Sequence, residues 1–403
     1  MWQCGRSHLT IWTMMNDEIL LRYGCNPHQV PARVFTRNAH LPFKVLNGSV
    51  GYINLLDALN SWQLVRELQN ATGQVAAASF KHVSPTGAAL GLPLSDTLRK
   101  VYRLEGLELS AVATAYGRAR GTDRVCSFGD WAAVSDTADL SLAKLLQREV
   151  SDGIIAPAYE PEALTILSKK KQGAYVILQI DANYTPPALE VRDVFGVTLE
   201  QKRNDTEMDV GILEKTLTER RDWPASAQRD AIVALTTLKY TQSNSVCVAV
   251  DGQTIGIGAG QQSRIHCTEI ACSKADNWYL RQSPRALELN FKLEVRRPDR
   301  DNAVDDYLRG AVSAGQQAWE EMFVKMPAPF RSDQKDEWLR GLHNAVLGSD
   351  GYIPFRDSID RARRSGIAFV VQPGGSNRDS QVTGACNEYG MVMAHTGVRL
   401  FHH

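Results

Sequence analysis

The chain has 403 residues, 43% of them hydrophobic, which is enough for one large core or two of ordinary domain size. Its 45 basic and 45 acidic residues cancel, and this balance excludes the strongly basic surface typical of nucleic-acid-binding proteins. Because no apolar run approaches the roughly 18 residues of a membrane span and the N-terminus lacks the pattern of a signal peptide, we expect a cytosolic protein without a membrane partner.

The first informative segments follow a weakly patterned N-terminus. Residues 1–16 show no sustained hydrophobic period, and we interpret them as a tail. The glycine and proline in residues 21–29 predict a loop, which concentrates Arg22 and Tyr23. Residues 53–69 then place leucines, a valine and a tryptophan at helical spacing, which indicates an amphipathic helix that faces the core.

A basic pair follows a predicted strand. Small and apolar residues over 76–80 indicate a buried strand, and Pro85 and Gly87 are expected to end it, so that Lys81 and His82 lie at its exposed end. Neighbouring strand residues point to opposite faces, so both side chains can serve one ligand only where the regular pleat breaks down. An ammonium beside an imidazole is suited to acid–base chemistry. The alternative is a surface lysine next to a histidine that caps a loop.

The middle of the chain alternates helices with apolar strands. The predicted elements are helices at 95–104, 138–149 and 160–170 and strands at 153–156 and 174–180. The apolar stretch 124–136 is interrupted by Gly129, where a ligand or another backbone can come close. Asp152 stands directly before the strand at 153–156. This alternation predicts an α/β domain with a largely covered sheet.

A polar, weakly patterned run over residues 201–224 is interpreted as a connector to a second half. A helix over 226–246 opens that half and ends in a polar cluster, and a hairpin follows over 246–260 with its turn at Asp251-Gly252. The later predicted elements are helices at 302–323, 333–342 and 358–365 and strands at 367–371 and 391–394. The triplet Ser-Asp-Gly, beside an apolar strand at both 151 and 349, hints at two similar subdomains.

Several familiar catalytic patterns are absent. A zinc deaminase needs H-x-E followed by P-C-x-x-C, a Ser or Cys hydrolase needs G-x-S-x-G, and neither pattern occurs. The seven scattered cysteines contain no C-x-x-C, which argues against a disulfide framework and a cysteine zinc site. The glycine run over 256–260 lacks the dinucleotide-binding spacing. Because it opens a helix that begins near Gln261, it is suited to holding an anion on backbone amides.

Nine segments combine into a specific resemblance. They occur in order from Leu21 to His403 and are LRYGCNPHQ, FKHVSPTGAA, SFGD, REVSDGIIAPAYEPEAL, KYTQSNSV, IGIGAGQQSRIHC, KADNWYLR, PFRDSID and RLFHH. Together they resemble the transformylase domain of the bifunctional purine biosynthesis family, which joins AICAR transformylase to IMP cyclohydrolase. The cyclohydrolase half has no counterpart here, so we expect a stand-alone transformylase or a separated domain and assign no IMP formation to it.

The resemblance implies transfer of the formyl group of 10-formyltetrahydrofolate to the 5-amino group of AICAR, which gives FAICAR and tetrahydrofolate in de novo purine biosynthesis. His82 corresponds to the base that accepts the amine proton, and Lys81 to the cation that stabilises the transition state. The positions that correspond to nucleotide contacts are Arg22, Tyr23, Gly129, Asp152, Asn244, Arg264, Tyr352 and Arg399. The positions on the folate side are Ile265, Asp357, Ser376 and Asn377.

The resemblance also implies a fold of two cytidine-deaminase-like α/β/α subdomains without the catalytic zinc. The first is expected over residues 17–203 and the second over 226–403, with 204–225 as connector. A homodimer whose active sites combine residues of both chains is implied as well, and so is a monovalent cation site that usually holds potassium. Two other functions stay open: a purine- or folate-binding homologue without catalysis, and a folate-dependent transferase that acts on another amine.

Overall fold

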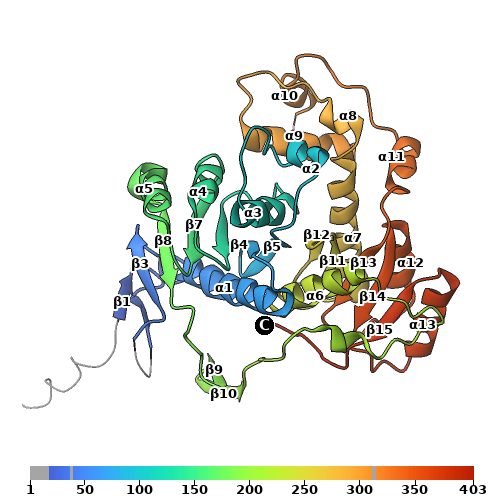
Figure 1. Ribbon diagram of the computed structural model, residues 1–403, viewed down its shortest axis with the longest axis horizontal. Helices are drawn as coiled ribbons and strands as arrows, with labels where there is room; N and C mark the ends of the chain where they lie inside the picture. Colours follow the sequence, from blue (N-terminus) through green and yellow to red (C-terminus); the bar gives the residue numbers. More distant parts are fainter. Residues whose placement is uncertain (1–17, 37–39, 311–314) are drawn as a thin grey trace, which may run out of the picture.

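One mixed sheet of eleven strands runs through the molecule, with helices packed on both of its faces (Figure 1). The computed structural model describes residues 18–36, 40–310 and 315–403, so the predicted tail, residues 1–16, lies outside the described residues. The strands of this sheet are β3 (Phe43–Asn47), β4 (Ala76–Lys81), β5 (Ser84–Leu90), β6 (Asp130–Val134), β7 (Ser151–Ala156), β8 (Val176–Ile180), β11 (Val246–Val250), β12 (Gln253–Gly258), β13 (Ala345–Ser349), β14 (Ile367–Gln372) and β15 (Val392–His395). They lie in the order β15-β14-β13-β11-β12-β5-β4-β6-β7-β8-β3. The predicted α/β class is confirmed.

The two halves of the sheet repeat one pattern of strand pairing. In the first half β4 pairs antiparallel with β5 and β6, and β6, β7 and β8 then follow in parallel. In the second half β11 pairs antiparallel with β12 and β13, and β13, β14 and β15 follow in parallel. The Ser-Asp-Gly triplets do not mark this repeat, because the first begins β7 and the second begins at the last residue of β13. These two strands occupy different places in the pattern.

Helices form a layer on each face of the sheet. One layer consists of α1 (Tyr52–Thr72) and α6 (Ala225–Lys239), which pack against each other. The other contains α3 (Ala111–Gly121), α4 (Leu140–Gln147), α5 (Pro161–Lys169), α7 (Arg264–Leu280), α12 (Asp357–Arg364) and α13 (Asp379–Glu388). Two apolar clusters result, one on each side of the sheet. Of these helices, α3 and α13 had no predicted counterpart.

Local sequence explains where several helices begin and end. The side chains of Ser95, Ser110 and Asp139 accept hydrogen bonds from backbone amides at the start of α2 (Asp96–Val101), α3 and α4. At the other end of α1, Gly73 takes the left-handed conformation that closes many helices, with φ of +67°. The helix predicted at 53–69 is confirmed by α1.

The strand end predicted at Pro85 is wrong, because residues 84–90 form β5. Only His82 and Val83 lie between β4 and β5, and Lys81 pairs with Ser84 across the hairpin. Proline is accommodated because the β4–β5 register shifts between Ser79 and Phe80, opposite this part of β5. The basic pair therefore lies at a tight turn rather than at the start of a loop.

The glycines of the run at 256–260 mostly serve packing. A Cβ at Gly256 would lie 2.1 Å from the carbonyl oxygen of Ala271, and a Cβ at Gly258 would lie 2.3 Å from that of Cys267. These two positions let α7 pack closely onto β12. The helix begins at Arg264 rather than near Gln261, and the anion site at this run stays a prediction. Gly260, with φ of +66°, has open space around it.

The two halves meet at the β5–β12 seam, the contact between β5 and β12 in the centre of the sheet. The Leu90 N–H donates to Gly252 O at 2.9 Å. Thr254 adds side-chain bonds, since its hydroxyl accepts from the Ala88 N–H at 3.0 Å and its carbonyl accepts from the Thr122 hydroxyl at 2.6 Å. The seam therefore joins β5, β12 and the end of α3 through buried hydrogen bonds.

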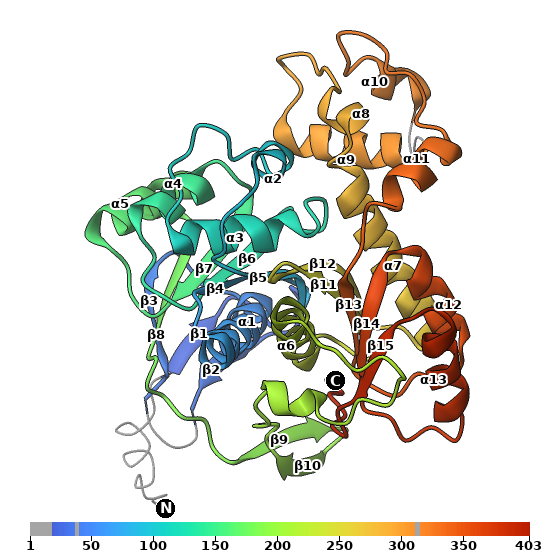
Figure 2. The same cartoon turned by 45° about the vertical axis from the view of Figure 1, so that its right-hand side comes forward.

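Beyond the end of α7, a lobe of short helices projects from the sheet (Figure 2). It contains α8 (Pro284–Leu287), α9 (Arg297–Arg309), α10 (Gln316–Glu320) and α11 (Ser332–Leu339), around an apolar cluster of its own. The helix predicted over 302–323 is wrong as one element, because Gly310, with φ of +72°, ends α9. None of the described helices combines the length and apolar character needed to cross a membrane.

Two small ribbons and two short turns complete the described structure. In the first ribbon β1 (Glu18–Leu21) pairs with β2 (Ala32–Phe35), and in the second β9 (Leu189–Val194) pairs with β10 (Val197–Lys202). The 3₁₀ turns are η1 (Lys170–Gly173) and η2 (Val210–Leu213). All twelve residues of β9 and β10 are exposed, so this hairpin contributes to neither core of the sheet.

Candidate active site

The turn after β4 carries the predicted acid–base pair. His82 and Val83 have φ of +54° and +58°, a left-handed conformation that is rare for a β-branched residue. The Val83 N–H donates to Asp57 Oδ1 at 2.7 Å, so a carboxylate of α1 holds the turn. The His82 side chain is exposed, whereas Lys81, the last residue of β4, donates to Phe128 O at 2.5 Å. The pleat ends between the two basic side chains, as predicted.

Asp57 is a titratable group that sequence reasoning missed. It is only 6% exposed, on the buried side of α1. Burial raises the pKa of Asp57 to about 6, against the opposing effects of the Val83 N–H and the charge of His82, and the Asp152 carboxylate raises it further. In the sequence, Asp57 could have been recognised as an acidic residue among leucines at helical spacing.

Stability should depend on pH through Asp57. The folded chain holds this proton up to about pH 6, whereas the ordinary pKa of an aspartate is 3.8. The free energy of unfolding should therefore fall as the pH rises from about 4 to about 6 and level off above that. The Asp57→Asn variant has no titrating group at this position, so its unfolding free energy should not show this fall. The difference in unfolding free energy between the unaltered protein and the variant, measured by urea titration, should therefore change by about 2 kcal/mol between about pH 4.5 and about pH 7.5. A constant difference would contradict the assignment, and the exposed Asp96→Asn serves as control.

Two further predicted residues lie beside this turn. Gly129 follows the carbonyl that Lys81 contacts and has φ of +76°, and a Cβ there would lie 4.0 Å from Asp152 Oδ2. Asp152 is the second residue of β7 rather than the residue before the strand, and its carboxylate pairs with Lys171. The structure therefore brings Lys81, Gly129 and Asp152 together.

A second group is built around a buried ion pair. Arg264, 7% exposed at the start of α7, donates from Nη1 to Asp350 Oδ1 at 2.6 Å and from Nη2 to Asn244 Oδ1 at 3.0 Å. The other carboxylate oxygen, Asp350 Oδ2, accepts from the Ser243 hydroxyl at 2.7 Å and from the Ser245 N–H at 2.9 Å. The predicted residues Asn244 and Arg264 are thus fixed by Asp350, which sequence reasoning missed.

The remaining predicted residues lie outside these two groups. Arg399 lies 4.6 Å from the Phe401 ring centroid, and Phe401 lies near Gly351, beside the buried ion pair. Arg22 lies 5.9 Å from the Tyr23 ring centroid in the loop between β1 and β2. The others are exposed or partly exposed at the start of α7, before and at the start of α12, and in the loop before α13: Ile265, Tyr352, Asp357, Ser376 and Asn377.

Within the described residues, no hydrogen bond or ion pair joins Lys81 or His82 to Asn244 or Arg264. Their segments do touch, since the Gln242 N–H donates to the hydroxyl of Ser84 at 3.3 Å. One chain therefore holds two groups of predicted residues on neighbouring segments rather than a single connected cluster.

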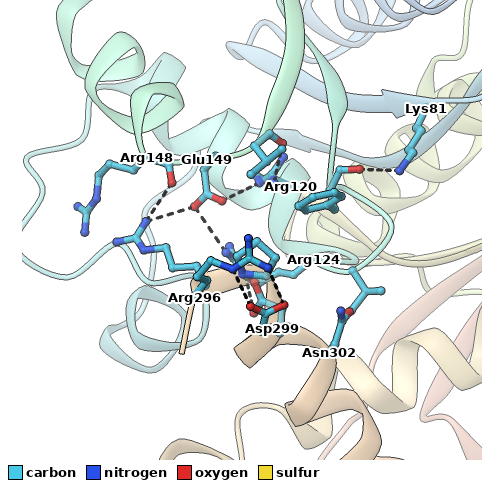
Figure 3. Close-up of a pocket in the computed structure, with 14 residues that line it drawn as sticks. Lys81, Arg120, Arg124, Arg148, Glu149, Arg296, Asp299 and Asn302 are labelled. Atoms are coloured by element: carbon cyan, nitrogen blue, oxygen red, sulfur yellow. Dashed lines mark hydrogen bonds and ion pairs between the residues drawn. The ribbon is translucent and has the colours of Figure 1, made fainter. Parts of the chain in front are cut away.

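A cavity of about 390 Å³ opens beside Lys81 (Figure 3). Lys81 is the one predicted site residue that lines it. Sequence reasoning missed its other polar lining residues. They lie at or after the end of α3, directly after α4, and directly before or within the start of α9: Arg120, Arg124, Arg148, Glu149, Arg296, Arg297, Asp299, Asp301 and Asn302. The double arginine at 296–297 was the visible signal.

Comparisons with known proteins match this chain to one family. A family model described as AICARFT/IMPCHase bienzyme matches residues 6–274. The chain is 30% identical over 391 residues to the bifunctional purine biosynthesis protein PurH of Xylella fastidiosa (strain 9a5c), covering 95% of this chain and 58% of the relative. It is 32% identical over 391 residues to PurH of Aquifex aeolicus (strain VF5), covering 95% and 59%. The chain thus spans under three fifths of the length of these relatives. It belongs to the AICARFT/IMPCHase bienzyme family.

Proposed function

We propose that this chain transfers the formyl group of 10-formyltetrahydrofolate to the 5-amino group of AICAR. The observation that carries the proposal is the turn after β4. It presents an exposed imidazole at His82 next to the ammonium of Lys81, and the lysine also lines the large cavity. Family membership supports the same activity. The product would be FAICAR, and tetrahydrofolate would be released.

The chemistry suits the two side chains. The AICAR amine is a weak nucleophile because its ring is electron-poor, so it needs a base as it attacks the formyl carbon. His82 accepts the amine proton while the new C–N bond forms. Lys81 stabilises the oxyanion of the tetrahedral intermediate. The bond between the formyl carbon and folate N10 then breaks, and N10 takes up a proton.

In this proposal each of the other predicted residues contacts either AICAR or the folate. Arg22 and Arg399 bind the AICAR phosphate, because a guanidinium can donate two parallel hydrogen bonds to it. Tyr352, 52% exposed, stacks on a ligand ring. The remaining contacts to the nucleotide are Tyr23, Gly129, Asp152, Asn244 and Arg264, and the contacts to the folate are Ile265, Asp357, Ser376 and Asn377.

The proposal extends to fold and assembly. The repeated pairing pattern supports two cytidine-deaminase-like subdomains, over residues 17–203 and 226–403. A second copy of the chain forms a homodimer and completes each site, so that Lys81 of one chain works with Asn244 of the other. The exposed apolar side chains of the β9–β10 hairpin support this, because a free two-stranded hairpin is marginally stable. These are Leu189, Val191, Val194, Phe195, Val197 and Leu199.

A monovalent cation site also belongs to the proposal. The Ser245 hydroxyl is buried without a hydrogen-bond partner among the described residues, and the Ser245 N–H contacts Asp350. Hydroxyl, carboxylate and backbone oxygens suit potassium, so Ser245 and Asp350 would hold it. The cation would tie these oxygen ligands together, and Asp350 in turn positions the Arg264 side chain.

Potassium should therefore raise the melting temperature. Replacing potassium by tetramethylammonium at equal ionic strength should lower the melting temperature, because the methyl groups keep that ion from direct coordination by oxygen ligands. The shift, followed by scanning calorimetry, should disappear in Ser245→Ala and persist in Ser380→Ala on the exposed surface of α13. Equal melting temperatures of the unaltered protein in both salts would count against the site.

The direct test of the activity is an assay with AICAR and 10-formyltetrahydrofolate. We expect FAICAR and tetrahydrofolate in equal amounts. AICAR binding without product would identify a non-catalytic homologue. Turnover of a different amine that AICAR fails to inhibit would identify another folate-dependent transferase.

A further inference from the structure

A second cavity lies where the end of α2 meets the lobe, and these elements lie side by side in Figure 1 and Figure 2. Its volume is about 190 Å³, and it shares Asp301 with the cavity beside Lys81. Among the described residues that line it, four are cationic and one, Asp301, is anionic, which leaves an excess of three positive charges. The cations are Lys100, Arg103, Arg281 and Arg300.

The carboxylate of Asp301 is already shared by several arginines. It pairs with Arg103 at 3.1 Å, with Arg124 at 3.1 Å and with Arg281 at 3.6 Å. Arg281 has a second carboxylate partner in Asp305. Arg103 has no second ion-pair partner within the described structure. One carboxylate therefore does not neutralise the arginines that gather around it.

Two cations of the second cavity have no carboxylate partner within the described part of the chain. Lys100 is exposed in the last turn of α2, and its ammonium makes no ion pair there. Arg300 donates to the carbonyl oxygens of Val295 at 2.8 Å and of Lys292 at 3.0 Å, which are uncharged. The charges of Lys100 and Arg300 are thus left without compensation by the protein.

Arg103 stands in an unusual backbone position. It follows α2 with φ of +56°, in the left-handed region that favours glycine after a helix. Burial lowers the pKa of Arg103, and the charges of three neighbouring arginines lower it further, against the opposing effect of Asp301. A guanidinium is therefore held among like charges at a position where glycine would suit the backbone better.

We propose that the second cavity binds a phosphate group through Lys100, Arg103 and Arg300. A phosphate carries about 1.5 to 2 negative charges at about pH 7, and a guanidinium can donate two parallel hydrogen bonds to it. A carboxylate carries one charge and would leave more of the excess uncompensated. The volume lies below the range for drug-sized ligands, which begins at about 300 Å³, so the cavity suits a small anion.

Two sources of the phosphate group share this chemistry, free inorganic phosphate and a small phosphate monoester. The cavity wall also contains apolar side chains that can contact the carbon part of an ester: Val101, Ala286, Leu287, Leu289, Phe291 and Val304. In either case the bound phosphate would connect α2 to the lobe, because Lys100 and Arg103 belong to the first half and Arg300 to α9.

The test is calorimetric titration with inorganic phosphate, at saturating AICAR so that the phosphate site proposed for the nucleotide is filled. We expect binding that the double variant Lys100→Ala/Arg103→Gln weakens by about tenfold. In this variant Asp301 keeps its other two arginines, so no buried carboxylate loses all its partners. Arg300 is left unchanged because it holds the backbone of residues 292–295.

The matched control removes two cations that line the larger cavity and do not line the second one. This variant, Arg148→Ala/Arg296→Ala, should keep its affinity for phosphate. Phosphate should also raise the melting temperature of the unaltered protein and of the control, relative to chloride at equal ionic strength, by more than that of the double variant. The single variant Lys100→Ala removes an exposed side chain without an ion pair and should weaken phosphate binding by about threefold.

Phenyl phosphate separates the two sources. Tighter binding of phenyl phosphate than of inorganic phosphate, lost in the double variant, would identify a monoester as the ligand, and equal or weaker binding would identify free phosphate. The site would be overturned by an unaltered protein that does not bind phosphate, or by unchanged affinity in the double variant. Acetate that binds as tightly as phosphate would also overturn it. None of these measurements depends on formyl transfer, so they test the site apart from the proposed function.

Discussion

Replacing His82 by alanine should lower kcat for formyl transfer to AICAR by about a hundredfold to ten-thousandfold, because the amine loses the base that accepts its proton. The rate is followed by the formation of tetrahydrofolate at saturating AICAR. Since the His82 side chain is exposed and makes no hydrogen bond within the described structure, its removal should leave the circular dichroism spectrum unchanged.

The backbone at this turn calls for a second variant. Alanine is less suited than histidine or asparagine to a φ of +54°, so His82→Asn keeps the turn while it removes the base. Both variants should lose activity to a similar extent. The control His343→Ala removes an exposed histidine in the second half of the chain and should retain full activity. Full activity in His82→Asn would refute the assignment of the base.

Mixing two inactive variants should restore about a quarter of the activity. If each site takes Lys81 from one chain and Asn244 from the other, a heterodimer of Lys81→Ala and Asn244→Ala has one intact site and one doubly impaired site. Random pairing of equal amounts makes half of the dimers heterodimers, which gives about one quarter of all sites intact. Asn244 is preferable to Arg264 here, because removing that arginine would leave the buried Asp350 without its ion pair.

Subunit exchange must be verified in the same experiment. Mass spectrometry of differently labelled chains should show heterodimers before activity is measured. Each variant alone, carried through the same exchange, gives the background rate. Heterodimers without recovered activity would mean that both residues act within one chain, and the shared-site proposal would then be wrong.

Sequence reasoning succeeded where the local pattern decides the structure. The spacing of apolar residues predicted α1, and the dipeptide Asp251-Gly252 predicted the turn between β11 and β12, because both residues can adopt positive φ. It failed at Pro85, where a shift in the pairing of two strands admits a proline that local rules exclude. That shift depends on the partner strand and is invisible in the segment itself.

In the candidate site, too, the sequence predicted what depends on neighbouring residues and missed what depends on distant ones. Lys81 and His82 stand together in the sequence, and their motif identified them. Arg264 and Asp350 are 86 residues apart, and only the packing of α7 against the strands brings them within 2.6 Å. Arg148 is the residue after α4 and Arg296 is the residue before α9, so the charge of the cavity emerges only once the lobe is placed.

The β5–β12 seam limits how ligands can enter. A hinge between the two halves would have to break the main-chain bond from Leu90 to Gly252 and expose the buried hydroxyl of Thr254. Such an opening breaks several buried hydrogen bonds at once, each worth about 0.5–1.5 kcal/mol. We therefore expect the two halves to stay joined at this seam while ligands bind and leave.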